Sequence, residues 1–165
     1  MRNVNEKLNM IEDNMVNSNL PLGVRNCNPL NIRFSPMNNW KGQTGSNKGF
    51  CVFENLEFGY RAALVLLCNY QRKGYDTVAK IVSHWAPASE NDTEAYIDYI
   101  VTNCVDGLMH SLVSADTRIT NFETLAQICW TMSKYECGKV DYETKLRMIH
   151  AFTSAKCYKH PALCV

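Results

Sequence analysis

The sequence predicts a mainly α-helical domain that carries a small β-hairpin lobe, and two patterns lead to this prediction. Beyond residue 55, apolar side chains recur at the three- and four-residue spacing of helices that bury one face. Between residues 24 and 53, prolines and glycines interrupt any such period. The 165 residues suit one compact domain. We therefore expect an N-terminal helical extension over residues 1–20 and a single domain over residues 21–165.

The N-terminal third of the chain is expected to hold one short helix and the lobe. Leu8, Ile11 and Met15 lie at helical spacing and predict a helix over residues 3–16. The lobe of residues 24–53 should consist of loops and a hairpin, with a strand from Phe50 to Phe53.

The later helices are predicted from apolar periods that start after a capping side chain. They cover residues 58 to about 70, 77 to about 85, 93 to about 100, 121–136 and about 142–156. The capping side chains are expected at Asp76–Thr77, Asn91–Thr93, Thr120–Asn121 and Asp141. Pro87 and Gly138 end two of these helices, since proline cannot continue a helix and glycine favours a left-handed end. Residues 105–120 show no clear period, so we expect a loop with a helical turn.

Composition excludes several classes of protein. With 17 basic and 16 acidic side chains, the chain has no tail typical of nucleic-acid binding. No apolar run approaches the roughly 20 residues that a membrane span requires. The first dozen residues are polar and mixed in charge, so we expect no cleavable export signal and synthesis in the cytoplasm.

The cysteines and histidines give no indication of a metal site. The eight cysteines form no CxxC pair and the histidines are scattered, so we expect neither a metal nor a cofactor. Cys68, Cys104 and Cys129 have apolar neighbours and are interpreted as small core residues. We expect mostly reduced thiols, while a bridge among Cys137, Cys157 and Cys164 stays open.

One carboxylate, Glu136, lies on the buried face of its predicted helix. At about 100° per residue it is about 20° from Leu125, 20° from Cys129 and 40° from Met132, which form the apolar stripe. Partial burial and the negative end of the helix dipole both favour the protonated form, which a general acid requires. The alternative is a side chain that reaches solvent at a frayed helix end and pairs with Lys134 or Lys139.

The lobe has the composition of a sugar-binding surface. Segment 25–53 contains no acidic side chain but combines basic residues, a tryptophan and many side-chain amides. Amides can bond to the hydroxyl and acetamido groups of a sugar, a tryptophan ring can cover a pyranose face, and positive charge suits an anionic polymer. The candidate substrate-binding residues, with one from outside the lobe, are Asn28, Asn31, Arg33, Trp40, Gln43 and Tyr96. Trp40 could equally anchor the lobe to the core.

A set of short motifs resembles a family of phage and prophage proteins. The motifs are GVRNCNPLNIR at residues 23–33, WKGQ at 40–43, FCVF at 50–53, GYRA at 59–62, WAP at 85–87, ENDTEAY at 90–96 and ECG at 136–138. Members of that family are described as virion structural proteins or as peptidoglycan-degrading, lysozyme-like enzymes. The resemblance covers roughly residues 23–140, and it departs from the family pattern at Cys27, where asparagine is usual.

The lobe also resembles that of bacterial cell-wall glucosaminidases, in which the catalytic glutamate closes a helix before the lobe. In this chain Glu136 closes a helix after the lobe. We therefore expect a permuted lysozyme-like arrangement, in which the late helix supplies the acid and the early lobe lines the cleft.

The resemblance implies a peptidoglycan hydrolase of phage type that cuts between N-acetylmuramic acid and N-acetylglucosamine, as a muramidase or a lytic transglycosylase. Glu136 would be the general acid, and the substrate's acetamido or 6-hydroxyl group, or a water, would complete cleavage. Glu54 is the candidate second carboxylate, and Glu12 is the acid that an unpermuted order would use. Glu90 and Asp92 fit a helix cap better than catalysis.

Two other functions stay open. The first is a non-catalytic virion or wall-binding protein with the same fold. The second is a peptidase with Cys27 or Cys51 as nucleophile and His84 as base, although neither cysteine opens a helix, where the dipole would activate a thiol. The expected partner is the peptidoglycan strand, not nucleic acid. We expect a monomer that acts on the wall after release or as part of a virion.

Overall fold

The computed structural model describes residues 20–104 and 112–138. Its elements are α2 (Leu22–Arg25), β1 (Gln43–Asn47), β2 (Phe50–Phe53), α3 (Leu56–Arg72), α4 (Val78–Trp85), α5 (Thr93–Asn103) and α6 (Phe122–Cys137). The expected mainly α architecture with a small two-stranded sheet is therefore confirmed. The helices expected over residues 3–16 and 142–156, together with Glu12, lie outside the described residues.

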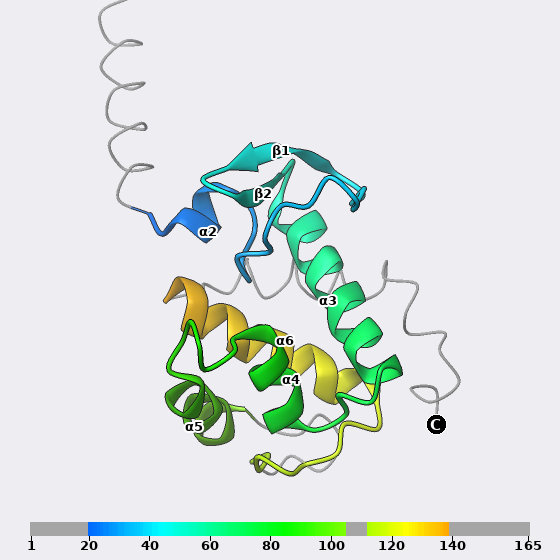
Figure 1. Ribbon diagram of the computed structural model, residues 1–165, viewed down its shortest axis with the longest axis vertical. Coiled ribbons are helices and arrows are strands. Elements are labelled where there is room, and N and C mark those ends of the chain that lie inside the picture. The colour runs from blue at the N-terminus through cyan, green and yellow to red at the C-terminus, as the bar shows by residue number, and fades with distance from the viewer. Residues whose placement is uncertain (1–19, 105–111, 139–165) are drawn as a thin grey trace, which may run out of the picture.

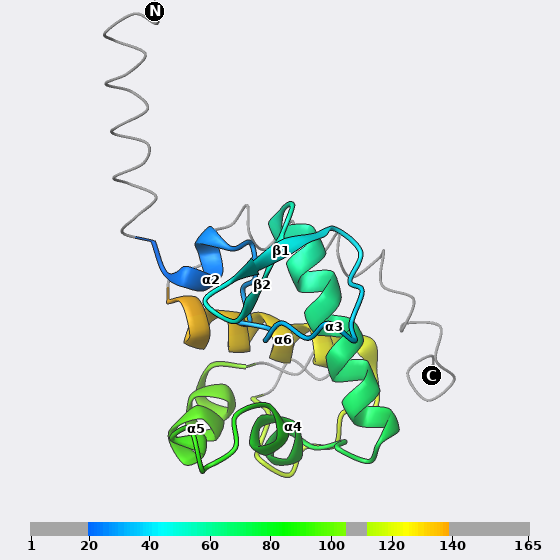
Figure 2. The same ribbon diagram turned by 45° about the horizontal axis from the view of Figure 1, so that its top comes forward.

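Helix α6 lies at the centre of the arrangement (Figure 1) and contacts α2, α3 and α5. The hairpin and α2 lie on one side of α6, and α4 and α5 lie on the other, which Figure 2 shows from a second direction. Helix α3 begins beside the sheet, contacts β2 and packs against α6. The lobe therefore lies against the end of the late helix on which Glu136 was predicted.

Side-chain caps set the starts of the four longer helices. Asn55, Thr77, Asp92 and Asn121 each accept a hydrogen bond from the backbone N–H three residues later. These caps satisfy amide groups that have no partner within a helix. The predicted starts near residues 77, 93 and 121 are confirmed. Gly138 ends α6 with a φ of 75°, which also confirms the predicted stop.

The hairpin joins β1 to β2 in antiparallel register, and its turn is Lys48–Gly49. Both turn residues have positive φ, 51° and 83°, which is typical of the two-residue turn that matches strand twist. The predicted strand at Phe50–Phe53 is confirmed.

Asn28 holds the loop before the hairpin in place. Its amide donates to the carbonyls of Ile32 and Cys51, both at 3.0 Å, and its oxygen accepts from the Ile32 N–H at 2.8 Å. The side chain is 0% exposed. The polar atoms of Asn28 are therefore buried and used by the fold, which gives no support to the prediction that Asn28 binds substrate.

The core forms mainly between α3 and α6. Its large, fully buried side chains include Tyr60, Leu64, Leu67, Leu125, Ile128 and Met132. The Tyr60 hydroxyl donates to Ser133 Oγ at 2.9 Å, which satisfies the one polar group that this ring buries. Cys68, Cys104 and Cys129 are buried as predicted. A Cβ on Gly59 would lie 2.0 Å from the Cys27 carbonyl oxygen, so only glycine lets α3 approach the lobe this closely.

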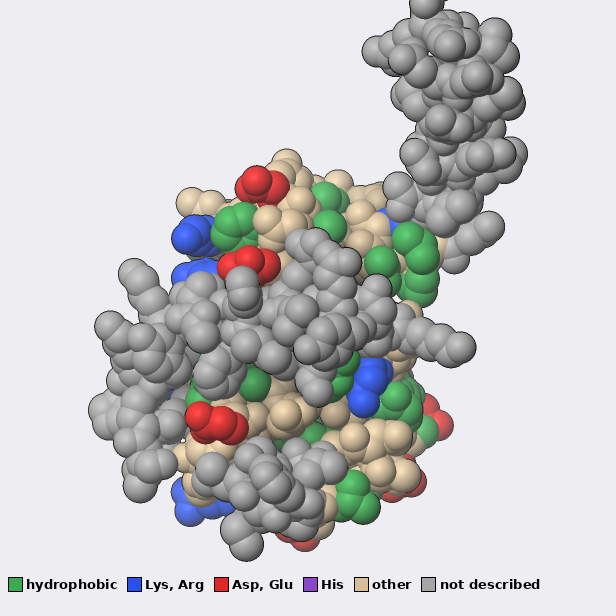
Figure 3. All heavy atoms as spheres, turned by 180° about the vertical axis from the view of Figure 1, so that it is seen from behind, with side chains coloured by type: hydrophobic (Ala, Val, Ile, Leu, Met, Phe, Trp, Pro, Cys, Tyr) green, Lys and Arg blue, Asp and Glu red, His purple; other side chains and the backbone are tan. Residues whose placement is uncertain are grey.

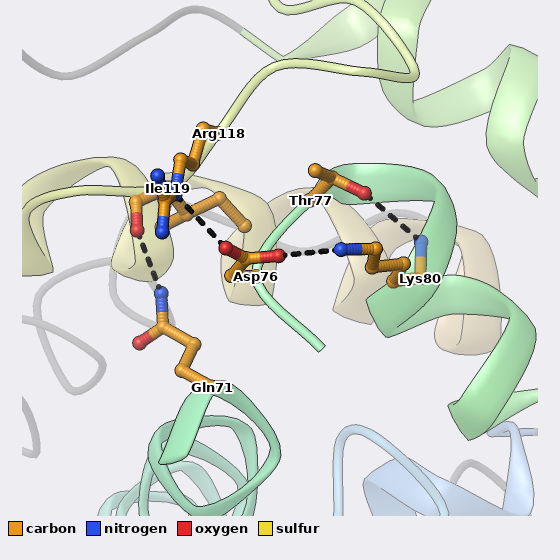
Figure 4. Close-up of polar contacts among 6 residues, drawn as sticks. All are labelled: Gln71, Asp76, Thr77, Lys80, Arg118 and Ile119. Atoms are coloured by element: carbon orange, nitrogen blue, oxygen red, sulfur yellow. Dashed lines mark hydrogen bonds and ion pairs between the residues drawn. The ribbon is translucent and has the colours of Figure 1, made fainter. Parts of the chain in front are cut away.

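Asp76 links the start of α4 to the segment before α6 that contains Arg118 and Ile119 (Figure 4). Its carboxylate pairs with Lys80 Nζ at 2.8 Å and with Arg118 Nε at 2.9 Å. Its carbonyl accepts from the Ile119 N–H at 2.9 Å, and Gln71 Nε2 donates to the Ile119 carbonyl at 3.1 Å. Lys80, followed by Arg118, holds the Asp76 pKa below its ordinary value.

Described residues 112–120 form a loop, as expected, and 105–111 lie outside the description. On the face seen in Figure 3, acidic and basic side chains are both present and lie scattered among neutral ones. Within the described part of the chain, no helix is both long and apolar enough to cross a membrane.

Candidate functional site

Glu136 lies in the last turn of α6, on the face that the sequence predicted. Leu125, Cys129 and Met132 on the same face are each 0% exposed, whereas Glu136 is half-buried. The core stripe of α6 therefore ends in a carboxylate. The alternative of a frayed end that pairs with Lys134 is not what the structure shows, and Lys139 lies outside the described residues.

Two neutral donors from distant parts of the chain hold this carboxylate. Asn31 Nδ2 donates to Glu136 Oε2 at 2.9 Å across 105 residues of sequence. The Tyr96 hydroxyl donates to Glu136 Oε1 at 3.1 Å. Both residues were predicted site residues, and the structure brings them together with Glu136. We define the Glu136 cluster as Glu136, Asn31 and Tyr96.

The backbone of the lobe directs Asn31 toward α6. Its neighbours Leu30 and Ile32 are 0% and 4% exposed, which anchors the chain on both sides. Asn31 itself has a φ of 50°, in the left-handed region where asparagine is one of the better-tolerated residues. Its N–H donates to the Asn28 carbonyl at 2.9 Å. The turn therefore presents the Asn31 amide at the end of α6.

Tyr96 reaches the cluster from α5. It is 2% exposed, and its ring stacks on Tyr135 with centroids 3.9 Å apart. Burial, and then the negative charge of Glu136, raise the pKa of Tyr96 above its ordinary value. The hydroxyl therefore keeps its proton and acts as the donor.

Cys137 fastens the end of α6 to the lobe, a role that sequence reasoning missed. Its thiol donates to the Pro29 carbonyl at 3.2 Å. A Cβ on Gly23 would lie 2.7 Å from the Cys137 sulfur, so α2 also packs closely here. Burial, with Glu136 second, raises the Cys137 pKa to about 12. The predicted alternative of a bridge to Cys157 or Cys164 involves residues outside the description.

An exposed ion pair joins the loop that carries Asn31 to the turn before α5, the helix that carries Tyr96. Arg33 Nη2 and Glu90 Oε2 are 2.6 Å apart, and their side chains are 76% and 53% exposed. The expectation that Glu90 caps a helix is wrong, because Asp92 caps α5 through the Ala95 N–H at 3.1 Å.

The other predicted site residues make different contacts. Trp40 is half-buried and packs against the core, which favours the anchoring interpretation, and its buried Nε1 has no hydrogen-bond partner among the described residues. Gln43 Nε2 donates to the Gly45 carbonyl at 3.5 Å. Glu54 is exposed. Among the hydrogen bonds and ion pairs of residues 20–104 and 112–138, none joins these three side chains to Glu136.

The peptidase alternative finds no support in the geometry. Cys51 is 0% exposed, and burial raises the pKa of its thiol. His84 stacks on Tyr75 with ring centroids 4.1 Å apart and helps line a hollow of about 350 Å³ on α4. Figures 1 and 2 show β2, which carries Cys51, and α4, which carries His84, on opposite sides of α6.

The charges around Glu136 are few. Within the described residues, no three histidine, cysteine or acidic side chains converge on one point, and the ion pairs do not include Glu136. Each of its oxygens accepts one bond, and a carboxylate oxygen has a second lone pair. The site therefore offers one oriented carboxyl group, suited to proton transfer.

Comparison with known proteins links the chain to bacteriophages. No model of a known protein family matches it. A region of 83 residues is 36% identical to Protein P5 of Pseudoalteromonas phage PM2. The alignment covers 47% of this chain and 52% of Protein P5, so the chain spans about half the length of the relative that it matches. The bacteriophage connection expected from the sequence is confirmed to this extent.

Proposed function

We propose that this protein cleaves the glycan strand of peptidoglycan, with Glu136 as the general acid. The observation that carries the proposal is the convergence of three distant segments on one half-buried carboxyl group. A carboxylate at the C-terminal end of a helix is unfavourable for stability. Two dedicated donors that orient such a group are better explained by chemistry than by folding.

In the proposed mechanism, Glu136 protonates the bridging oxygen between N-acetylmuramic acid and N-acetylglucosamine. Asn31 and Tyr96 fix the rotamer of the carboxyl group, so that the proton is delivered from a defined direction. The substrate's acetamido or 6-hydroxyl group, or a water, then completes the cleavage. Glu54, exposed at the end of β2, is the candidate for a second carboxylate.

The proposed architecture is a permuted lysozyme-like one. The lobe precedes the acid-bearing helix in the chain, and its Asn31 contacts the acid directly. That contact supports the proposal that the lobe lines the substrate site. The similarity to a phage protein supports a phage context, in which an enzyme of the proposed kind would act on the bacterial wall at lysis or from within the virion.

The test is a comparison of Glu136→Gln with Glu123→Gln on purified peptidoglycan. Glu123 is an exposed acid in the first turn of the same helix, so its variant controls for loss of charge. We expect wild type and Glu123→Gln to clear a peptidoglycan suspension and Glu136→Gln to fail, with unchanged circular dichroism. Mass spectrometry of the products then separates anhydro ends from reducing ends. Full activity of Glu136→Gln would refute the assignment.

A second candidate is a non-catalytic virion or wall-binding protein. The observation that favours it is the partial similarity to Protein P5 of a phage. This candidate predicts that the wild type binds purified peptidoglycan or virions without releasing any soluble fragment.

A further inference from the structure

We propose that Arg33 binds a carboxylate of the peptidoglycan peptide stem, and that Glu90 occupies this position until substrate arrives. The inference rests on the proposed function for the identity of the polymer. It assigns a binding role and a competing internal ligand to an ion pair that the proposed cleavage mechanism does not use.

The ion pair forms between the same two segments that supply the donors to Glu136. Arg33 lies two residues after Asn31 in the lobe, and the buried Ile32 between them anchors this segment. Glu90 lies just before α5, the helix that carries Tyr96. The same two segments that meet at Glu136 therefore meet again, nearer to solvent, at the ion pair.

The Glu90 side of the pair has a well-defined backbone. The N–H groups of Glu90 and Asn91 donate to the Pro87 carbonyl at 2.9 and 3.1 Å. The Thr93 hydroxyl donates to the Ala86 carbonyl at 2.6 Å in a buried bond. Because the turn is held without the Glu90 side chain, that side chain can leave Arg33 while the turn keeps its shape.

The Arg33 side of the pair has the chemistry of a carboxylate receptor. A guanidinium group matches a carboxylate in shape and charge. Segment 25–53 has no acid of its own, so Arg33 takes its partner from another part of the chain. Both side chains are more than half exposed, and an exposed ion pair of this kind is weak enough to exchange. Peptide stems of peptidoglycan carry free carboxylates that can replace Glu90.

The test is a sedimentation assay with purified insoluble peptidoglycan, performed in a Glu136→Gln background so that the polymer stays intact. We expect Arg33→Gln to weaken binding about twofold to fivefold and Glu90→Gln to strengthen it by a similar factor. In an Arg33→Gln chain, Glu90→Gln should bring a much smaller gain. Arg25→Gln, which removes another exposed cation of the lobe, should have little effect.

The same polymer with its free carboxylates amidated provides the second arm. The effects of Arg33→Gln and Glu90→Gln should both disappear on this neutralised polymer and fade in high salt. Unchanged binding by Arg33→Gln, or weaker binding by Glu90→Gln, would overturn the inference. If the wild type cleaves peptidoglycan but binding does not depend on Arg33, this inference is refuted and the proposed function stands. If binding depends on Arg33 but the wild type cleaves nothing, only the proposed function is refuted.

Discussion

Two carboxylates tie distant segments together in this protein, and they do so with opposite chemistry. Asp76 pairs with two cations, Lys80 and Arg118, near the surface. Glu136 is half-buried at a helix end and is held by two neutral donors, Asn31 and Tyr96. Compensation by cations is typical of a carboxylate that stabilises a fold, whereas neutral donors orient the group and leave its charge uncancelled. The comparison separates an acid that is paired with cations from the one that we propose as the general acid.

The largest expected effect is the loss of peptidoglycan cleavage when Glu136 is substituted. Glu136→Gln should reduce peptidoglycan cleavage by about 10²–10⁴-fold, the usual worth of a positioned acid. Its stability in urea should not fall, because glutamine can accept from Asn31 and donate to Tyr96. Asp76→Asn should show the reverse, with full activity and a lower urea midpoint. If Glu136→Gln unfolds as readily as Asp76→Asn, the two acids have the same structural role.

The left-handed backbone at Asn31 should make two substitutions differ in stability. Asn31→Gly loses the bond to Glu136 but accepts the φ of 50°. Asn31→Ala loses the same bond and also adopts an unfavourable backbone, so it should be about 1 kcal/mol less stable than the glycine variant. Urea denaturation measures the difference. Equal stabilities would mean that the turn relaxes.

Removing the Tyr96 hydroxyl, the other donor to Glu136, should reduce stability by a similar amount. Tyr96→Phe should lower the free energy of unfolding by about 1 kcal/mol, since it removes a hydroxyl that donates to Glu136 Oε1 at 3.1 Å and also reaches the Met132 carbonyl at 3.5 Å. The cost should shrink in a Glu136→Ala background, which a double-mutant cycle measures. Tyr99→Phe on the same helix is the control. A cost that is independent of Glu136 would place the role of the hydroxyl elsewhere.

The smallest expected effect concerns pH at Asp76. Its pKa is lowered in the folded state, chiefly by Lys80. The folded protein therefore binds this proton more weakly than the unfolded chain does. The stabilisation is present above the unfolded pKa, about 3.9, and is lost as the pH falls through the lower folded value. The thermal midpoints of wild type and Asp76→Asn should thus converge below about pH 4.

Sequence reasoning was most successful for features that depend on neighbours in the chain. The starts of α4, α5 and α6 follow from Thr77, Asp92 and Asn121, because a cap bonds to an amide three residues away. The half-buried position of Glu136 follows from the period of one helix, which also placed Leu125 and Met132 in the core.

Sequence reasoning did not identify the partners of two polar side chains. Asn28 has the composition of a sugar ligand, yet its amide is used by the backbone of Ile32, four residues away, and of Cys51, 23 residues away. Glu90 has the position of a cap, yet it pairs with Arg33, which lies 57 residues away. Neither partner is readable from local pattern, since amides and carboxylates bond equally well to many groups.

The sequence by itself determined the helical class, the hairpin lobe, the helix starts and the side of α6 on which Glu136 lies. All of these depend on periodicity and on hydrogen bonds within a few residues. Only the tertiary structure decided that Asn31 and Tyr96 hold Glu136, that Arg33 meets Glu90, and that Asn28 is internal. The physical reason is that packing of α6 against the lobe and α5 brings together groups that are far apart in the chain, and no local sequence pattern predicts such contacts.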